Sequence, residues 1–150
     1  MNGDKVYLDT SALLPYYREE PASQKVQAFL DTMRPPVLLS DLTKVEVVSA
    51  IARWVRLEEI TEPQAALLEN TFAQDSGAGL FVFRPVTMTH YQQAEKWLSA
   101  RKTALRTLDA LHVACCCSQQ ARLVTCDSIM YQAAITLGIE SQLISTDDAR

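Results

Sequence analysis

The stretch that most constrains the fold runs from Arg106 to Asp127, with the sequence RTLDALHVACCCSQQARLVTCD. Its first part is apolar on nearly every side, which is typical of a helix buried inside a core. Residues 122–126 have the pattern of a short interior strand. Two acids nonetheless stand here, Asp109 in the first turn of the helix and Asp127 where the strand ends. Because a buried carboxylate normally needs a partner or a metal ion, both are candidate functional residues.

The length and composition of the chain fit one globular domain. It has 150 residues, of which 48% are hydrophobic and 21% charged, and these are ordinary values for a protein with a single core. No apolar run is long enough to span a bilayer, and the N-terminus lacks the pattern of a signal peptide. We therefore expect a single domain over residues 1–150, cytoplasmic and without a membrane partner, with a frayed polar tail over about 145–150.

Charge and cysteine content narrow the class further. A formal net charge of −4 argues against a protein that passively coats nucleic acid, because such proteins are basic. An enzyme that acts on nucleic acid stays possible, since its acids can hold a metal ion. The cysteines, including the triplet Cys115, Cys116 and Cys117, have no zinc-site spacing. We interpret them as small core residues in a reducing compartment.

Short apolar runs alternate with helical periodicity along the chain. Strands are expected at 6–8, 37–40, 80–83, 122–126 and 142–144, and helices at 12–17, 22–33, 42–57, 61–75, 87–100, from 106 onwards and after 127. This alternation predicts an α/β sandwich with a mostly parallel sheet. The expected buried stripe of helix 42–57 consists of Val45, Val48, Ile51, Ala52 and Val55.

Four acids have related positions in such a fold: Asp9, Glu46, Asp109 and Asp127. Asp9 and Asp127 follow strands, and in open α/β sheets a site lies beyond the carboxyl ends of the strands. Glu46 and Asp109 stand early in helices that can reach the same edge. Two carboxylates about 4 Å apart repel by about 4 kcal/mol at an effective dielectric near 20, so a cluster implies a divalent cation or raised pKa values. All-oxygen ligands suit magnesium or manganese, and such an ion favours phosphodiester hydrolysis by an activated water.

The motifs around these acids resemble those of PIN-domain nucleases. They are Tyr-Leu-Asp-Thr-Ser at 7–11, Leu-Thr-x-x-Glu-Val at 42–47, Leu-Arg-x-x-Asp-Ala-Leu-His-x-Ala at 105–114 and Leu-x-Thr-x-Asp at 123–127. The similarity covers essentially the whole chain and is greatest to VapC-type toxin ribonucleases. It implies a three-layer α/β/α sandwich with a short central sheet, and an endoribonuclease dependent on Mg²⁺ or Mn²⁺. It also implies a homodimer, a small antitoxin protein as partner, and RNA products with a 5′-phosphate. Met130, where an aromatic is frequent, and the cysteine triplet depart from the family pattern.

By position, Asp9, Glu46, Asp109 and Asp127 match the metal-binding and catalytic acids of that family, with Asp9 and Asp109 as the principal ligands. Each acid also has an ordinary interpretation. Asp9 fits a turn or cap, and Glu46 fits a capping box with Thr43. Asp109 suits the positive end of a helix dipole, and Asp127 can cap the next helix.

Three further residues are candidates for binding the substrate: Ser11, Arg106 and Thr125. Ser11 and Thr125 can support the site through hydrogen bonds. Arg106, one turn before Asp109, either holds a substrate phosphate or pairs with an acid. With Arg101 and Lys102 it forms a basic cluster that guides RNA or is simply solvated.

The histidines and tryptophans are expected to have structural parts. His112 lies one turn beyond Asp109 and fits a hydrogen-bonded core histidine better than a general base. His90 is expected at the surface, and Trp54 and Trp97 are expected to pack between helices.

Two other functions fit parts of the pattern. A phosphatase of the haloacid-dehalogenase kind also begins with an acid after its first strand, but it requires a second Asp where this chain has Ser11. A PIN scaffold without catalysis, serving only as an interaction module, is the other alternative, and the presence of all four acids counts against it.

Overall fold

The computed structural model describes residues 4–146, and its strands form one parallel sheet. They are β1 (Val6–Leu8), β2 (Val37–Ser40), β3 (Phe81–Arg84), β4 (Arg122–Thr125) and β5 (Ser141–Leu143). The strand order is β3-β2-β1-β4-β5, and every neighbouring pair is parallel. The predicted parallel α/β architecture is therefore confirmed. Residues 147–150 of the expected frayed tail lie outside the described part of the chain.

Helices connect successive strands, as a parallel sheet requires. They are α1 (Thr10–Leu13), α2 (Ser23–Thr32), α3 (Asp41–Arg56), α4 (Glu62–Gly77), α5 (Met88–Ala100), α6 (Thr107–Ser118) and α7 (Ser128–Thr136), with a short 3₁₀ helix η1 (Leu14–Tyr16) after α1. The helix expected at 12–17 thus begins earlier, directly after Asp9, and changes to 3₁₀ geometry at η1, where Pro15 lies.

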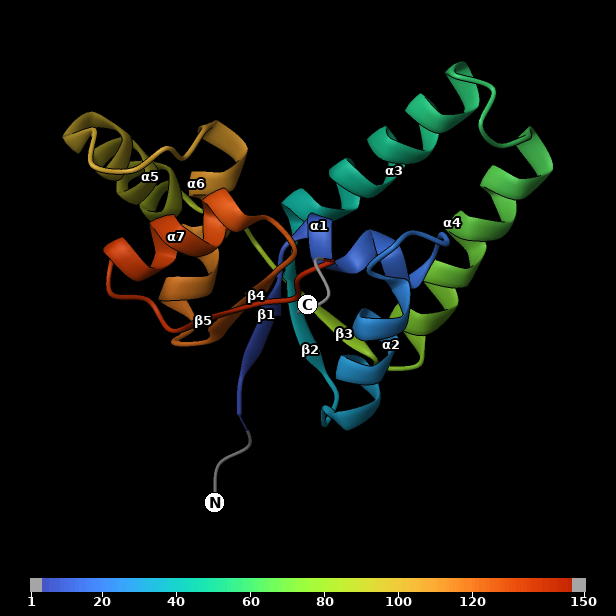
Figure 1. The fold of residues 1–150 in the computed structure, drawn as a ribbon, viewed down its shortest axis with the longest axis horizontal. Helices are drawn as coiled ribbons and strands as arrows, with labels where there is room; N and C mark the ends of the chain where they lie inside the picture. Colours follow the sequence, from blue (N-terminus) through green and yellow to red (C-terminus); the bar gives the residue numbers. More distant parts are fainter. Residues whose placement is uncertain (1–3, 147–150) are drawn as a thin grey trace.

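The two faces of the sheet contribute to two separate cores. Val6 and Leu8 of β1 point into a core with α2, α3 and α4, whereas Tyr7 between them points into a core with α5, α6 and α7. This alternation follows from the two-residue period of a strand. Figure 1 shows the two groups of helices on opposite sides of the sheet. The three-layer α/β/α sandwich is confirmed.

Helix α3 packs through a different face from the one expected. Val45 and Val48 are 63% and 48% exposed, whereas Val47, Ile51 and Trp54 are buried. The helix has apolar residues on two sides, and periodicity alone does not tell which side meets the core. The side with Trp54, its largest apolar residue, packs inward. The predicted stripe was therefore wrong at Val45, Val48 and Ala52, whereas Ile51 is buried and Val55 is partly buried against the same core. Trp54 packs between helices as expected.

His90 is buried, which corrects its expected surface position. Its Nδ1 accepts a hydrogen bond from the Thr87 N–H at 2.9 Å, and its Nε2 lies 2.7 Å from Ser118 Oγ. Burial lowers the pKa of His90. The neutral imidazole therefore joins the start of α5 to the last residue of α6.

The cysteines mostly behave as small core residues. Cys115 and Cys116 are buried, Cys126 is partly buried, and Cys117 is exposed, in contrast to the expectation for the triplet. Burial raises the pKa of the Cys115 thiol to about 11 and that of Cys116 to about 12. Both are therefore protonated and unreactive at neutral pH.

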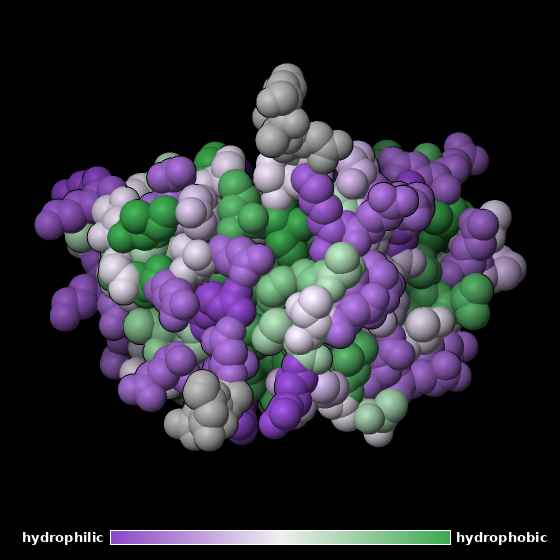
Figure 2. All heavy atoms as spheres, turned by 60° about the horizontal axis from the view of Figure 1, so that its bottom comes forward, coloured by the Kyte–Doolittle hydropathy of each residue, from purple (hydrophilic) through white to green (hydrophobic). Residues whose placement is uncertain are grey.

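The outer surface is mixed in polarity. Figure 2 shows the underside of the view in Figure 1, where hydrophobic and hydrophilic residues are interspersed. Within residues 4–146, no helix has both the length and the apolar character that a membrane span requires.

Candidate functional site

Two of the predicted acids lie at the carboxyl edge of adjacent central strands. Asp9 directly follows β1 and Asp127 follows β4, and the two strands pair in register, Leu8 with Val124. The backbone N–H of Asp9 continues the ladder by bonding to the Val124 carbonyl at 3.3 Å. In Figure 1, α1 starts where β1 ends, beside the first turn of α3. The edge predicted from sequence is therefore where the structure brings these segments together.

Asp9 is both a helix cap and a buried carboxylate. Only 3% of it is exposed. Its Oδ2 accepts from the Ser11 N–H at 3.3 Å, and its Oδ1 accepts from Ser11 Oγ at 3.0 Å. Burial raises the pKa of Asp9 to about 6, although the imidazole of His112 and hydrogen bonds from Ser11 and Thr125 act in the opposite direction. A carboxyl in this position is costly to ionise unless a cation accompanies it.

Ser11 and Thr125 connect Asp9 with Asp127. Ser11 Oγ lies 3.2 Å from Thr125 Oγ1 and accepts from the Cys126 N–H at 3.1 Å. Thr125 Oγ1 in turn accepts from the Asp127 N–H at 2.9 Å. Because Thr125 is 0% exposed, its hydroxyl supports the acids and has no access to a substrate.

Asp127 also caps the following helix, which is the ordinary interpretation of this residue. Its Oδ1 accepts from the Ile129 N–H at 2.8 Å and from the Met130 N–H at 3.3 Å, at the start of α7. Both bonds use the same oxygen. The cap therefore fixes the carboxylate while Oδ2 has no hydrogen bond to the described residues.

Glu46 is held by α1 and α6 and not by the start of its own helix. Its Oε1 accepts from Thr10 Oγ1 at 2.5 Å and makes a short contact with His112 Nε2. The capping box of α3 pairs Ser40 with Thr43, whose Oγ1 accepts from the Ser40 N–H at 3.3 Å. The expected box between Thr43 and Glu46 was therefore wrong. Burial acts to raise the pKa of Glu46, but the bonds from His112 and Thr10 and the charge of His112 outweigh it, and the pKa is lowered.

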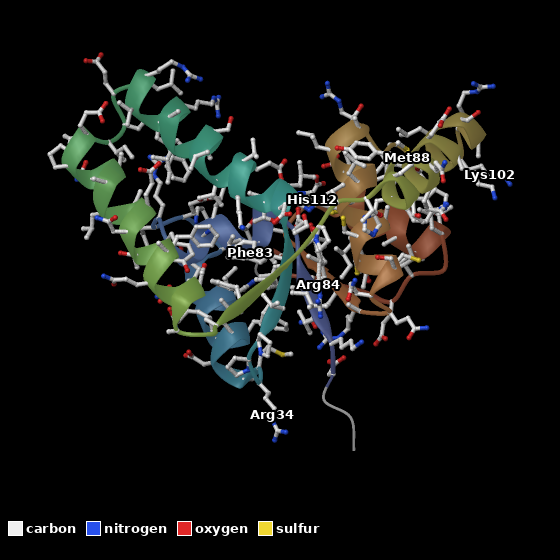
Figure 3. The ribbon with its side chains drawn as sticks, turned by 180° about the vertical axis from the view of Figure 1, so that it is seen from behind. Arg34, Phe83, Arg84, Met88, Lys102 and His112 are labelled. Carbon is white, nitrogen blue, oxygen red and sulfur yellow. The ribbon has the colours of Figure 1, made fainter. Side chains whose placement is uncertain are left out.

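His112 is a hydrogen-bonded core histidine, as expected. It is 2% exposed, and its Nδ1 lies 2.7 Å from the hydroxyl of Tyr7, which also bonds to Ser40 Oγ at 2.9 Å. Figure 3 shows His112 in the middle of the molecule, between the two groups of helices. The part played by Tyr7 was missed, although a tyrosine within a buried strand signals a hydroxyl that needs a partner.

The carboxyl group of Asp109 interacts electrostatically with two of the other acids. It is partly exposed, in contrast to the expected full burial, and stands in the first turn of α6. Burial raises its pKa, and the charges of Asp127 and, more weakly, Glu46 raise it further. His112 and the backbone N–H of Arg106 act in the opposite direction. Asp9, Glu46 and Asp109 thus each interact with the buried imidazole of His112, and Asp127 interacts with Asp109.

The chemistry of this group fits a divalent cation, although the side chains are not closed around one point. Within residues 4–146, no three Asp, Glu, His or Cys side chains meet closely enough to hold a metal ion as they stand. The donors are all carboxylate oxygens, which suit a hard cation. The mutual repulsion felt by Asp109 is the kind that such a cation relieves. The residues therefore fit a metal by charge and donor type.

The surroundings leave access to Glu46. A hollow of about 640 Å³ lies beside it, lined among others by Thr10, Leu108 and Arg53. Arg106 is exposed at the start of α6. Lys102 lies at the periphery of the molecule in Figure 3, far from His112. Lys102 of the predicted basic cluster therefore does not lie at the site, whereas the backbone of Arg106 makes a hydrogen bond to Asp109.

Comparison with known proteins gives a consistent result. The sequence profile of the PIN domain matches residues 6–136. FitAcB from Neisseria gonorrhoeae has a similar structure, with a TM-score of 0.74 at 19% identity over 93% of this chain and 97% of that one. VapC20 from Mycobacterium tuberculosis, described as a toxin that cleaves the sarcin–ricin loop, has a TM-score of 0.67 at 15% identity over 86% and 95%.

A third similar structure is VapBC2 from Rickettsia felis, bound to a DNA fragment of its promoter. Its TM-score is 0.65 at 10% identity, over 92% of this chain and 97% of that one. At these identities the likeness concerns the fold. No curated protein matches the sequence.

Proposed function

Because this chain belongs to the PIN-domain family, we propose that it is a metal-dependent endoribonuclease that hydrolyses RNA phosphodiester bonds. The observation that supports this most is the gathering of Asp9, Glu46, Asp109 and Asp127 around the carboxyl edge of β1 and β4. Such a collection of carboxylates is unfavourable without a cation, and a hollow beside Glu46 gives a substrate access.

The proposed roles follow from the contacts of each residue. Asp9 and Asp109 are the principal ligands of Mg²⁺ or Mn²⁺, and Glu46 and Asp127 contribute through the oxygens that hydrogen bonds leave available. The bound ion supplies an activated water and neutralises charge on the phosphate. Ser11 orients Asp9 through two hydrogen bonds. Arg106 holds a substrate phosphate, and hydrolysis leaves a 5′-phosphate.

We further propose that the protein is the cytoplasmic toxin of a toxin–antitoxin pair and a homodimer. The resemblance of its motifs to VapC-type ribonucleases and the similar fold of VapC20 support this assignment. Helix α3 offers two exposed apolar side chains, Val45 and Val48. A hollow of about 360 Å³ between α3 and α4 continues this surface. We assign the protein partners to this region.

The test is RNA cleavage with added Mg²⁺ or Mn²⁺. Wild type should cut single-stranded RNA, and chelation of the metal should stop it. Asp9→Asn and Asp109→Asn should each reduce cleavage to the level without metal. Asp41→Asn is the matched control, since Asp41 is an exposed acid of α3 that pairs with Lys44 at 3.5 Å, and it should cut like wild type. Equal cleavage by wild type and Asp9→Asn would refute the proposal.

A further inference from the structure

A buried hydrogen-bond network connects Glu46, through His112, with two buried residues that are not acids of the site. It runs from Ser40 Oγ through the Tyr7 hydroxyl to His112 Nδ1, and from His112 Nε2 to Glu46 Oε1. Ser40 and Tyr7 are 0% exposed and His112 is 2% exposed. Polar groups buried to this extent are costly unless all of them are paired, so the network fixes the ring of His112.

Both hydrogen bonds to the carboxylate of Glu46 are made to the same oxygen. Thr10 Oγ1 and His112 Nε2 both approach Oε1, while Oε2 has no hydrogen bond to any described residue. Because the partner atom is a carboxylate oxygen, Nε2 must present a proton to it. The ring is thus oriented from behind by Tyr7 and uses its other nitrogen to hold one oxygen of Glu46.

We propose that His112 is a positioning residue of the metal site, which holds Glu46 by Oε1 so that Oε2 alone is offered to a divalent cation. This inference rests on the metal-dependent function proposed above. Tyr7 acts one step further back, by fixing the ring of His112. Partners of this kind, which bond to a ligand and not to the metal, typically change metal affinity about 10- to 100-fold when they are removed.

The main test measures Mn²⁺ affinity of the RNA-free protein, by paramagnetic resonance of free Mn²⁺ and by the rise in Tm on adding Mn²⁺. His112→Leu, which keeps an apolar side chain in the core, should weaken Mn²⁺ binding about 10- to 100-fold. His112→Gln places an amide N–H near the position of Nε2 and should restore most of the affinity. Unchanged or tighter binding in His112→Leu would overturn the proposal.

A structural contribution is separated by a matched control. His90 is also a buried histidine with both ring nitrogens hydrogen-bonded, but its partners are Thr87 and Ser118. His90→Leu should lower Tm and leave Mn²⁺ affinity unchanged. If His112→Leu does not fold, Tyr7→Phe removes only the supporting hydroxyl, and it should weaken Mn²⁺ binding by a smaller factor. An equal loss of affinity in His90→Leu, or no loss in Tyr7→Phe, would contradict the inference.

A double-mutant cycle tests whether His112 acts through Glu46. Glu46→Gln keeps an oxygen for Thr10 and His112 but presents an amide to the cation, so it should weaken Mn²⁺ binding by itself. In that background His112→Leu should have no further effect. Additive losses would show that His112 acts elsewhere. If wild type binds no Mn²⁺ at all, it is the proposed metal-dependent function that fails, whereas normal binding with an insensitive His112→Leu refutes this inference alone.

Discussion

At the scale of single residues, each acid of the site has a structural duty as well as a proposed chemical one. Asp9 caps α1 and Asp127 caps α7, and in both cases the bonds come from backbone N–H groups close in sequence. These local duties were readable from sequence, because caps follow short-range rules. The contact between Glu46 and His112 was not, since these residues are 66 positions apart and only the folded chain brings them together.

The stability of the metal-free protein should depend on pH through Asp9. Its pKa is about 6 in the fold against an ordinary value of 3.8, so the folded state holds this proton more tightly. The stabilisation that protonated Asp9 gives to the fold is fully present below about pH 4 and is lost as pH rises to about 6. The free energy of unfolding should change by about 3 kcal/mol over this range. Asp9→Asn should remove that dependence. Urea unfolding at pH 4 and pH 7.5 with a chelator present measures it, and a variant less stable than wild type at pH 7.5 would contradict it.

Asp109→Asn should leave the metal-free protein equally stable or slightly more stable. The substitution removes repulsion from Asp127 and Glu46, and because Asp109 is partly exposed we expect a gain of no more than about 1 kcal/mol. Urea unfolding with a chelator present provides the measurement. A large loss of stability would mean instead that the hydrogen bond with the Arg106 backbone is the main duty of this side chain.

At the scale of elements, the pattern of strands and helices was predictable because each segment has a clear period and clear breaks. Which side of α3 packs against the core was not predictable, since valines occupy both of its sides. The position of His90 was missed for a related reason. An imidazole within an amphipathic helix resembles a surface residue until its neighbours are known, and here the partner Ser118 lies on another helix.

The orientation of α3 can be tested with two adjacent valines. Val48 is 48% exposed and Val47 is 3% exposed. Val48→Lys should change the free energy of unfolding by no more than about 0.5 kcal/mol, as surface substitutions usually do. Val47→Lys should cost several kcal/mol, because it buries an unpaired charge. Urea unfolding of both variants gives the comparison, and similar losses would mean that α3 is rotated from its described orientation.

The hydrogen bonds by which His90 joins α5 to α6 should contribute less to stability at acidic pH. Burial lowers the pKa of His90, so below its ordinary value the unfolded chain binds a proton that the folded chain excludes. Stability from this group is present above about pH 6.5 and is lost as pH falls below it. His90→Gln should therefore cost about 1–2 kcal/mol at pH 8, from lost hydrogen bonds, and less at pH 5. A greater cost at pH 5 than at pH 8 would refute this assignment.

At the scale of the whole molecule, the site depends on both helical layers. Glu46 comes from the layer of α2, α3 and α4, and Asp109 from that of α5, α6 and α7. The class of architecture was predictable from the alternation of elements, and the site edge from the general rule for parallel sheets. The degree to which the carboxylates converge was not, because side-chain geometry depends on hydrogen bonds with no sequence pattern.

A metal that joins the two layers should stabilise the folded protein as a whole. At about 100 times its dissociation constant, Mn²⁺ should add about 2.7 kcal/mol to the free energy of unfolding. Thermal unfolding with increasing Mn²⁺ measures this, and Asp9→Asn combined with Asp109→Asn should abolish the rise in Tm. A rise that persists in this double variant would locate the ion elsewhere.

The central position of β1, paired on one side with β2 and on the other with β4, has a consequence during translation. A nascent chain that has emerged only as far as α5 still lacks Asp109 and Asp127, and one edge of its first strand is open. We therefore expect it to have no hydrolytic activity at that stage.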